Sequence, residues 1–393
     1  MKRVAVLGGG PAGAMAGERL AAGGLETIII DEKLAWEKPC GGGITFKAYH
    51  QYPFLLENSA TKKLVHETRL AAPKAGSANM RLSQPLIIYS RTELNRLMLE
   101  RAEKAGARIE KVRVNELERS ASGWRLKTRH GAIEADYCVI ATGARNSFRQ
   151  VGTVFTPTDA ACALGYFIPG EQDHIDIQFL PNIAGYIWIF PRCGHLSAGI
   201  CGKGESSLHL RRVLERYLDE RGIRWKDGEF YGHVLPSLEW PAWRRNRVAG
   251  DGWMAVGDAA GLVDPITGEG IYYAIRSGDL AAQTLLSSAS APAQKACAYR
   301  QHLTSDFWRD LEYAASFARR IFLGSFLFGS VPARMVQFTR RSQRFQWLMQ
   351  DLFAGTQNYL TLKNRLMGSL NGTLQELVLG FFLNRIIPTR NQI

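Results

Sequence analysis

Apolar runs of strand length, followed by glycine-rich turns, punctuate this chain. The first run is Val4–Leu7, which leads into the turn Gly8–Gly13 and then into the small, apolar stretch Ala14–Ala22. A second run, Thr27–Ile30, follows and ends at Asp31. Segments of these lengths in this order predict a β-strand, a tight turn, an α-helix and a second β-strand. This is the βαβ unit of a doubly wound α/β domain.

The turn of this unit has the pattern of a phosphate-binding loop. In its spacing G-x-G-x-x-G, Gly8 permits the tight turn, Gly10 lets a pyrophosphate approach the backbone, and Gly13 lets helix and strand pack closely. Free N–H groups and the positive end of the helix dipole then face the phosphates. An acid after the second strand accepts hydrogen bonds from ribose hydroxyls. The residues expected to contact a dinucleotide here are Gly8, Gly10, Pro11, Ala12, Gly13, Asp31 and, as the fallback acid, Glu32.

Two later strands lead into turns of the same kind. Tyr137–Ile140 is an apolar run followed by an Ala-Thr-Gly turn, and Trp253–Val256 is a short strand followed by Gly-Asp and small residues. Asp258 is placed to accept a hydrogen bond from a sugar-alcohol hydroxyl, and the N–H groups after it can face a phosphate. We therefore expect both turns to bind the dinucleotide. Their candidate residues are Ala141, Thr142, Gly143, Gly257 and Asp258.

This combination of motifs resembles a known family. An N-terminal G-x-G-x-x-G paired with a late G-D-A-A-G-x-x-x-P-x-x-G-x-G, which begins at Gly257, is similar to the FAD-binding fold of the aromatic-hydroxylase class. Within that class, Asp264–Ile271, Lys38–Gly42 and Tyr186–Pro191 resemble the geranylgeranyl reductase family. The resemblance covers roughly residues 1–290. It implies that the dinucleotide is FAD rather than NAD.

The resemblance also implies roles around the flavin. A helix beginning at Gly268–Gly270 would direct its N–H groups at the pyrimidine edge of the flavin, where they stabilise negative charge. Arg91 matches a position that reaches the cofactor phosphates or ring; its alternative is a helix-surface arginine. Asp264 is either the N-cap of the flavin-facing helix or a neighbour of the cofactor. The cofactor-contacting residues implied in this way are Cys40, Gly41, Gly42, Arg91, Gly268, Glu269, Gly270 and Ile271.

Two groups of residues are candidates for the reaction and its substrate. Cys40 lies in a loop of small residues, a poor place for core packing, and the cysteine of this loop is implicated in catalysis in the reductase family. Its thiol could donate a proton, so Cys40 is the catalytic candidate; the alternative is a small buried side chain. Tyr186, Trp188 and Phe190 alternate along one strand and share a face, which is either core or, as the family implies, the wall of an apolar substrate cavity.

The remaining patterns predict an α/β protein, α+β overall. Residues 151–245 contain alternating and aromatic segments, which predict a mainly antiparallel sheet inserted between parts of a Rossmann-like domain. Ser90 and Glu93 form a capping-box pattern for a helix that runs to about Ala105. We expect residues 1–65, 91–150 and 246–300 to form the FAD-binding domain, residues 66–90 and 151–245 the substrate-binding domain, and residues 301–393 a C-terminal helical region.

Composition and charge indicate the binding partners and the cellular compartment to expect. The 393 residues carry a net charge of +13, and from residue 301 onward eleven basic residues face five acidic ones among many aromatics. This pattern suits an anionic membrane surface or the mouth of an isoprenoid site, and it lacks the motifs of nucleic-acid-binding modules. The six scattered cysteines indicate a reducing compartment, and the histidines show no ligand spacing, so no metal is assigned. We expect a cytoplasmic protein without a signal peptide, and a membrane-associated one if the basic region binds lipid.

The function expected from these observations is that of an FAD-dependent reductase for carbon–carbon double bonds in an isoprenoid or similar apolar chain. One alternative is a flavin-dependent monooxygenase or halogenase of the same fold. Another is a non-catalytic flavoprotein that binds an isoprenoid or quinone at a membrane surface. Because a second G-x-G-x-x-G is absent, NAD(P)H or another reductant would act as an external donor, and an electron-donor protein remains an alternative source.

Overall fold

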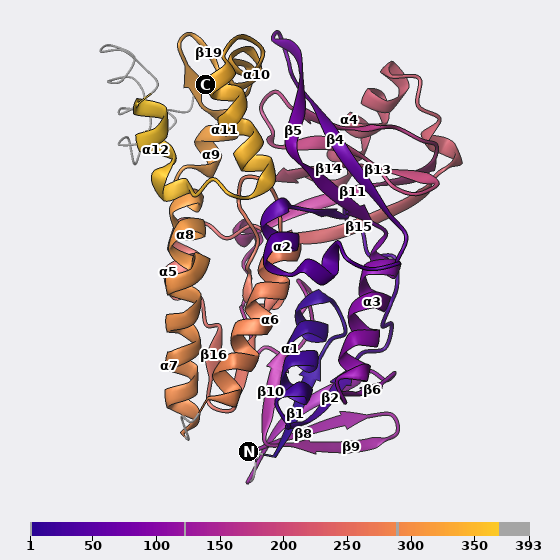
Figure 1. Ribbon diagram of the computed structural model, residues 1–393, viewed down its shortest axis with the longest axis vertical. Coiled ribbons are helices and arrows are strands. Elements are labelled where there is room, and N and C mark those ends of the chain that lie inside the picture. The colour runs from indigo at the N-terminus through magenta and orange to yellow at the C-terminus, as the bar shows by residue number, and fades with distance from the viewer. Residues whose placement is uncertain (1, 122, 288–290, 369–393) are drawn as a thin grey trace.

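The computed structural model describes residues 2–121, 123–287 and 291–368 (Figure 1). A six-stranded sheet occupies the lower part of the view, with the order β16-β17-β10-β1-β2-β6. Five of its strands run parallel, and β16 is antiparallel to β17. The strands are β1 Arg3–Leu7, β2 Glu26–Ile30, β6 Arg108–Glu110, β10 Tyr137–Ile140, β16 Ala249–Gly250 and β17 Trp253–Ala255.

Helices α1 (Pro11–Ala22), α3 (Arg91–Lys104) and α6 (Ile271–Leu286) pack together on this sheet (Figure 1). Two of them approach closely, because a Cβ on Gly278 of α6 would lie 2.3 Å from the carbonyl oxygen of Ala12 in α1. The predicted first helix begins at Pro11 rather than Ala14, since proline is well suited to the first turn of a helix.

The predicted cap of α3 is present, because the Ser90 hydroxyl accepts a hydrogen bond from the Glu93 N–H at 3.2 Å. The chain then enters an antiparallel meander of β7 (Val114–Ser120), β8 (Gly123–Thr128) and β9 (Gly131–Ala135). Of the turn expected at Ser122–Gly123, Ser122 lies outside the described residues.

An eight-stranded sheet occupies the upper part of the view, with the order β15-β11-β14-β13-β12-β4-β5-β3. All its neighbours are antiparallel except the parallel pair β4 and β12, as the alternating pattern of residues 151–245 predicts. The strands are β3 Gly43–Ile44, β4 Lys62–Ala72, β5 Gly76–Tyr89, β11 Ala160–Pro169, β12 His174–Phe179, β13 Ala184–Pro191, β14 His195–Lys203 and β15 Glu229–Pro236.

The domain boundary expected at residue 65 falls inside β4, and β3 also belongs to the eight-stranded sheet. We keep the division into an FAD-binding and a substrate-binding part as a proposal, with these two strands moved to the second part. The predicted α/β class, with a Rossmann-like domain, a mainly antiparallel sheet and C-terminal helices, is confirmed.

Strand β13 shows how the eight-stranded sheet separates its two faces. Its Ile187 and Ile189 pack against α4 (Ser207–Glu220), whose apolar stripe is formed by leucines at positions 210, 214 and 218. The alternate side chains, Trp188 among them, belong to a second cluster together with residues of α10 and α11. Because side chains alternate along a strand, one face of β13 packs against α4 and the other faces the C-terminal helices.

The C-terminal region is helical with one short hairpin. Strands β18 (Ser325–Phe326) and β19 (Gly329–Ser330) interrupt the expected run of helices. In the described part of the chain, every helix is too short or too polar to cross a lipid bilayer. The residues at 369–393, which carry part of the basic and aromatic pattern, lie outside the described residues. The remaining helices are α2 Phe46–Gln51, α5 Trp240–Arg245, α7 Pro292–Leu303, α8 Arg309–Ala315, α9 Ala318–Leu323, α10 Val331–Arg341, α11 Gln343–Ala354 and α12 Tyr359–Met367.

Candidate active site

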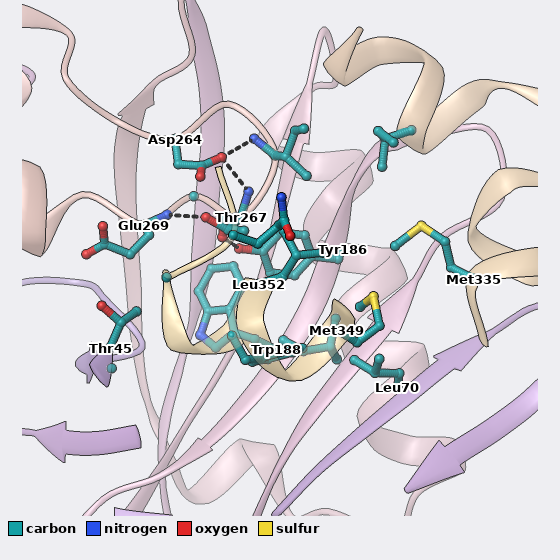
Figure 2. A pocket seen from close by; sticks show the side chains of 18 of the residues that line it. Thr45, Leu70, Tyr186, Trp188, Asp264, Thr267, Glu269, Met335, Met349 and Leu352 are labelled. Atoms are coloured by element: carbon teal, nitrogen blue, oxygen red, sulfur yellow. Dashed lines mark hydrogen bonds between the residues drawn. The ribbon is translucent and has the colours of Figure 1, made fainter. Parts of the chain in front are cut away.

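A cavity of about 540 Å³ lies where the eight-stranded sheet meets the C-terminal helices and the segment that leads into α6. Sheet residues such as Leu70 and Trp188 line the same space as Met335 of α10 and Met349 of α11 (Figure 2). The structure therefore brings segments far apart in the sequence around one chamber. The predicted site residues that line it are Cys40, Gly41, Gly42, Tyr186, Trp188, Phe190, Gly268, Glu269, Gly270 and Ile271.

The other predicted residues, except Arg91 at the start of α3, follow the parallel strands β1, β2, β10 and β17, at the edge where α/β sheets bind nucleotides. Gly8 has φ +117°, and a Cβ there would lie 2.2 Å from the Ala141 carbonyl oxygen. A Cβ on Gly13 would lie 1.9 Å from the Gly8 carbonyl oxygen. Gly10 differs, because a Cβ there would meet no described atom within 4 Å. The first two glycines close the turn, and Gly10 leaves open space above it, as a pyrophosphate requires.

The acid after β2 is oriented by the glycine turn. Asp31 Oδ2 accepts the N–H of Gly9 at 2.7 Å, and Asp31 Oδ1 accepts the N–H of Lys33 at 2.7 Å. Glu32 is exposed and lies 4.0 Å from Arg113. Asp31 rather than Glu32 therefore borders the turn in which Pro11 and Ala12 begin α1.

Two buried polar atoms near these turns lack a hydrogen-bond partner among the described residues. They are Nε of Arg91, whose side chain is buried at the start of α3, and Oγ1 of Thr142, in the turn after β10 that continues with Gly143. Buried donors are nearly always satisfied, so unpaired ones next to a phosphate-binding turn indicate a missing polar ligand. Together with the open space at Gly10, these atoms fit the pyrophosphate and ribityl groups of FAD.

Asp258, after β17 and Gly257, forms an ion pair with Lys38 at 2.9 Å. Burial raises the pKa of Asp258, but the charge and hydrogen bond of Lys38 outweigh it and hold this pKa below its usual value. Burial and the positive charge of Lys38 lower the pKa of His233 to about 4, so that its ring is neutral at pH 7. Nε2 of His233 is buried without a partner in the described chain, and the residue lines the cavity.

The Cys40 loop is held by backbone contacts on both sides. The Gly42 N–H donates to Cys40 Sγ at 3.3 Å, and the Gly42 carbonyl accepts the Tyr89 N–H at 3.0 Å. Gly42 has φ +83°, and a Cβ there would lie 2.1 Å from the Tyr89 carbonyl oxygen. Gly41 packs on the ring of Phe190, because its Cβ would come within 3.2 Å of that ring. Cys40 is half-buried and is one of the residues that line the cavity.

The aromatic side chains of β13 form part of the cavity wall. The rings of Tyr186 and Trp188 lie edge to face, with their centres 6.2 Å apart. The Tyr186 hydroxyl donates a hydrogen bond to the Thr267 carbonyl (Figure 2). This hydrogen bond ties the sheet wall to the segment that precedes α6. Because Phe190 reaches the Cys40 loop and Tyr186 reaches Thr267, the wall connects both segments expected near the flavin.

The segment before α6 carries buried carboxylates. Asp264 accepts the N–H groups of Ile266 and Thr267 at 2.8 and 3.0 Å and the hydroxyl of Tyr359 at 2.8 Å. Asp264 is therefore not the N-cap of α6, which is Gly270; it stabilises the preceding turn, and burial raises its pKa. Of the two roles expected for Asp264, the N-cap is wrong, because the chain makes a further turn between Asp264 and the helix; the role of cofactor neighbour stays a prediction.

Glu269 directly precedes Gly270, the N-cap of α6. Its Oε1 accepts the Tyr272 N–H of the first turn of α6 at 2.7 Å. Burial raises the pKa of Glu269 to about 7, and the ammonium of Lys47 opposes this shift. Burial likewise lowers the pKa of Lys47, which lines the same cavity. This part of the chamber is therefore polar, whereas the part facing the sheet is apolar.

Much of the apolar lining comes from residues that the sequence motifs do not mark. They lie on α10 and α11 at helical spacing, which signals an apolar face but not what it faces. In the described residues, no group of three or more histidine, cysteine or acidic side chains is placed to hold a metal ion. The unmarked lining residues include Met335, Phe338, Phe345, Met349, Leu352 and Phe353.

Comparisons with known proteins agree with this geometry. The pyridine nucleotide-disulphide oxidoreductase family model matches residues 2–156. A digeranylgeranylglycerophospholipid reductase of Thermoplasma volcanium is 30% identical over 318 residues, covering 71% of this chain and 76% of that protein. The chloroplastic geranylgeranyl diphosphate reductase of Arabidopsis thaliana is 29% identical over 320 residues, covering 72% and 65%.

Solved structures share the fold. A geranylgeranyl bacteriochlorophyll reductase-like protein of Thermoplasma acidophilum matches with a TM-score of 0.69 at 23% identity, covering 90% of this chain and 100% of that one. The flavin-dependent brominase Bmp2 matches with a TM-score of 0.68 at 16% identity, covering 90% and 93%. The fold is thus common to reductases and halogenases, whereas the sequence relatives named above are reductases. The chain belongs to the geranylgeranyl reductase family of FAD-dependent oxidoreductases.

Proposed function

We propose that this protein reduces carbon–carbon double bonds in an isoprenoid or a similar apolar chain. The observation that carries the proposal is the cavity of about 540 Å³, whose apolar aromatic wall reaches both the Cys40 loop and the segment before α6. A tightly packed core would leave no such cavity. A polar substrate would gain no apolar contact with the wall formed by Tyr186, Trp188 and Phe190. The names of the sequence relatives support the same substrate class.

In this proposal the residues of the three turns that follow β1, β10 and β17 would hold FAD, which when bound supplies hydride to one carbon of the alkene. Arg91 and Thr142 bind its polar groups, and Gly10 admits the pyrophosphate. The N-terminus of α6, which begins at Ile271 and lines the cavity, would stabilise negative charge on a flavin bound there. NAD(P)H, another small reductant or a donor protein would return the electrons.

Cys40 is the proposed proton donor to the second alkene carbon. The residue lines the cavity, and Phe190 and Gly41 place it beside the aromatic wall. A reduction of this kind needs a proton for the second alkene carbon, and the mainly apolar lining favours a donor in the cavity wall over bulk water. Glu269 and Lys47 lie in the polar part of the chamber.

We also propose that the C-terminal region docks on an anionic membrane, from which an apolar substrate would enter. The tip of the β18–β19 hairpin supports this: Phe328 is fully exposed, and both Leu327 and Phe328 have positive φ, at 48° and 60°. A turn that needs left-handed backbone usually carries glycine or asparagine, so two large apolar residues there indicate a use for them. Leu327 also lines the cavity, so the tip adjoins its edge.

Anaerobic stopped-flow reoxidation tests the catalytic proposal. Enzyme with photoreduced flavin is mixed with isoprenoid alkenes of increasing length, or with oxygen, and the saturated product is sought by mass spectrometry. A reductase is reoxidised by the alkene with formation of saturated product. Rapid reoxidation by oxygen alone, with oxygenated or halogenated product, would favour the monooxygenase or halogenase alternative. Lipid binding without reoxidation by any alkene would favour the non-catalytic one.

A further inference from the structure

Arg192, directly after the aromatic strand β13, carries a charge that is almost entirely buried. Its side chain is 0% exposed, and its guanidinium lies 5.1 Å from the centre of the Phe167 ring. Nη1 forms an ion pair with Glu37, and Nη2 donates to the carbonyl of Cys40. One guanidinium thus holds two acceptors on the segment that carries the candidate thiol, 152 residues away from Cys40 in the sequence.

Glu37 extends this contact to the start of α3. Its Oε1 accepts the Arg91 N–H at 3.0 Å, and its Oε2 accepts the Thr92 N–H at 3.2 Å. Burial raises the pKa of Glu37, but the charge of Arg192 and these N–H donors outweigh burial and hold the pKa below its usual value. The carboxylate therefore stays charged and joins Arg192 to the helix whose first residue has an unpaired buried Nε.

The Cys40 carbonyl is held from a second direction as well. The Ser197 hydroxyl donates to it at 3.0 Å, and Ser197 in turn lies 3.0 Å from the Tyr231 hydroxyl. Both Ser197 and Arg192 belong to the β13–β14 hairpin region of the eight-stranded sheet. The sheet that forms the substrate wall therefore also fixes the peptide plane at Cys40.

Stability alone is a poor reason for this arrangement, because a buried ion pair contributes little more than apolar residues of the same shape would. The ion pair instead fixes the relative positions of its two acceptors, because a planar guanidinium donates to both in a rigid geometry. We propose that Arg192 is a positioning residue: through the Cys40 carbonyl and Glu37, it sets where the Cys40 thiol lies in the cavity relative to the Arg91 end of α3. The purpose of that placement rests on the proposed function; the placement itself does not.

Alkylation of Cys40 tests the placement directly. FAD-loaded wild type, Arg192→Met, Arg192→Lys and Glu37→Gln are treated with iodoacetamide, and labelling of each cysteine is followed by peptide mass spectrometry. We expect Arg192→Met to label Cys40 roughly tenfold faster or more, the scale of losing a charge-assisted hydrogen bond. Arg192→Lys should fall between, because one ammonium cannot hold both acceptors in a fork. Exposed Cys297 serves as the internal reference.

Glu18→Gln is the matched control, because Glu18 forms a comparable part-buried ion pair with Arg101 between α1 and α3. It should lose stability without changing Cys40 labelling. Equal Cys40 labelling in wild type, Arg192→Lys and Glu37→Gln would overturn the proposal, and these two variants decide it if Arg192→Met does not fold.

Reoxidation kinetics then separate the proposal from the function on which its purpose rests. If the wild type reduces an alkene, kcat should fall in the order of the labelling rates while KM changes little. A kcat unchanged by faster labelling would overturn the catalytic purpose of the placement. If the wild type reduces no alkene, the proposed function fails, and the labelling rates still decide the placement.

Discussion

Gly199 lies directly behind the indole of Trp188: a Cβ on Gly199 would come within 2.3 Å of ring atom Cζ2. The two residues are paired across β13 and β14. Because Gly199 has no side chain, the indole of Trp188 can lie against β14, where it forms part of the cavity wall instead of filling the cavity.

This relationship predicts how Trp188 acts on substrate choice. Trp188→Ala should raise KM for a long isoprenoid by roughly tenfold and for a short analogue much less, because only the long chain covers this wall. A loss of about 50 Å² of apolar contact at ~25 cal/mol per Å² gives a factor of that size. Steady-state kinetics with both substrates measure the ratio, and Trp188→Phe, which keeps a ring, should fall between. Equal changes for the two substrates would mean that the wall does not contact the chain.

Gly10 provides a test of the FAD site that leaves the fold intact. A Cβ on Gly10 meets nothing within 4 Å, so Gly10→Ala should fold normally, yet the methyl group occupies the approach to the phosphate-binding turn. We expect FAD affinity to fall by about tenfold or more, the cost of one lost or lengthened charge-assisted contact. Titration of apoprotein by flavin fluorescence measures it.

Gly232→Ala is the matched control, because its Cβ also meets nothing within 4 Å and lies on β15, away from the turn. Equal FAD affinity in the two variants, at equal melting temperature, would contradict the assignment of the turn.

Cys40→Ala tests the proton donor. If the thiol protonates the alkene, alkene-dependent reoxidation should slow on the order of 10²-fold, the usual contribution of a general acid, while FAD affinity stays the same. Exposed Cys297, changed to alanine, should leave the rate unaltered. A Cys40→Ala enzyme as fast as the wild type would leave Cys40 as a packing residue and make solvent or Glu269 the proton source to examine.

The sequence predicts those parts of the structure that have local signals. The βαβ unit, the Ser90 cap and the alternation in β13 each depend on neighbouring residues, and each is present. The start of α1 was expected at Ala14, although Pro11 is itself a local signal for the first turn of a helix. The turn formed by Asp264 was not expected, because it depends on how the segment before α6 folds back on itself.

Residues whose importance arises from distant contacts could not be predicted. Arg192 follows the aromatic motif, but its partners Glu37 and Cys40 lie more than 150 positions earlier, and its total burial is a property of the folded sheet. The cavity-facing side of α10 and α11 shows helical periodicity in the sequence, yet periodicity does not distinguish a core face from a cavity wall.

Glu269 gives the protein a pH-dependent term in its stability. Burial raises its pKa to about 7, so the charged form is disfavoured in the folded state. The contribution of Glu269 to the free energy of unfolding is therefore fully present below its usual pKa of 4.5, and it is lost as the pH rises through about 7. Glu269→Gln should therefore gain stability relative to wild type between pH 5 and pH 8, on the order of 1–3 kcal/mol.

Melting temperatures at the two pH values measure this difference, with exposed Glu171→Gln as the control that should show none. A difference between Glu269→Gln and wild type that stays constant from pH 5 to pH 8 would show that Glu269 titrates normally.

The proposed membrane contact separates into an apolar and an electrostatic part. Phe328→Asp should greatly weaken co-sedimentation with anionic vesicles, because a charge at the fully exposed hairpin tip opposes insertion into lipid. Leu208→Asp is the matched control, since Leu208 is also exposed and apolar but lies on α4, on the opposite face of the eight-stranded sheet. Binding of the wild type to the vesicles should also fall as salt rises. At 0.1 M salt the Debye length is ~10 Å, so the salt screens the attraction between the anionic lipid and arginines such as Arg319 and Arg341.

Turnover of a detergent-solubilised substrate should hardly depend on salt, because the part of the cavity wall that faces the sheet and would contact the chain is apolar. Two results would contradict the contact: no sedimentation of the wild type even at low salt, or equal loss of binding in Phe328→Asp and Leu208→Asp. In either case the strained turn at Leu327 and Phe328 would serve to close the edge of the cavity, which Leu327 lines.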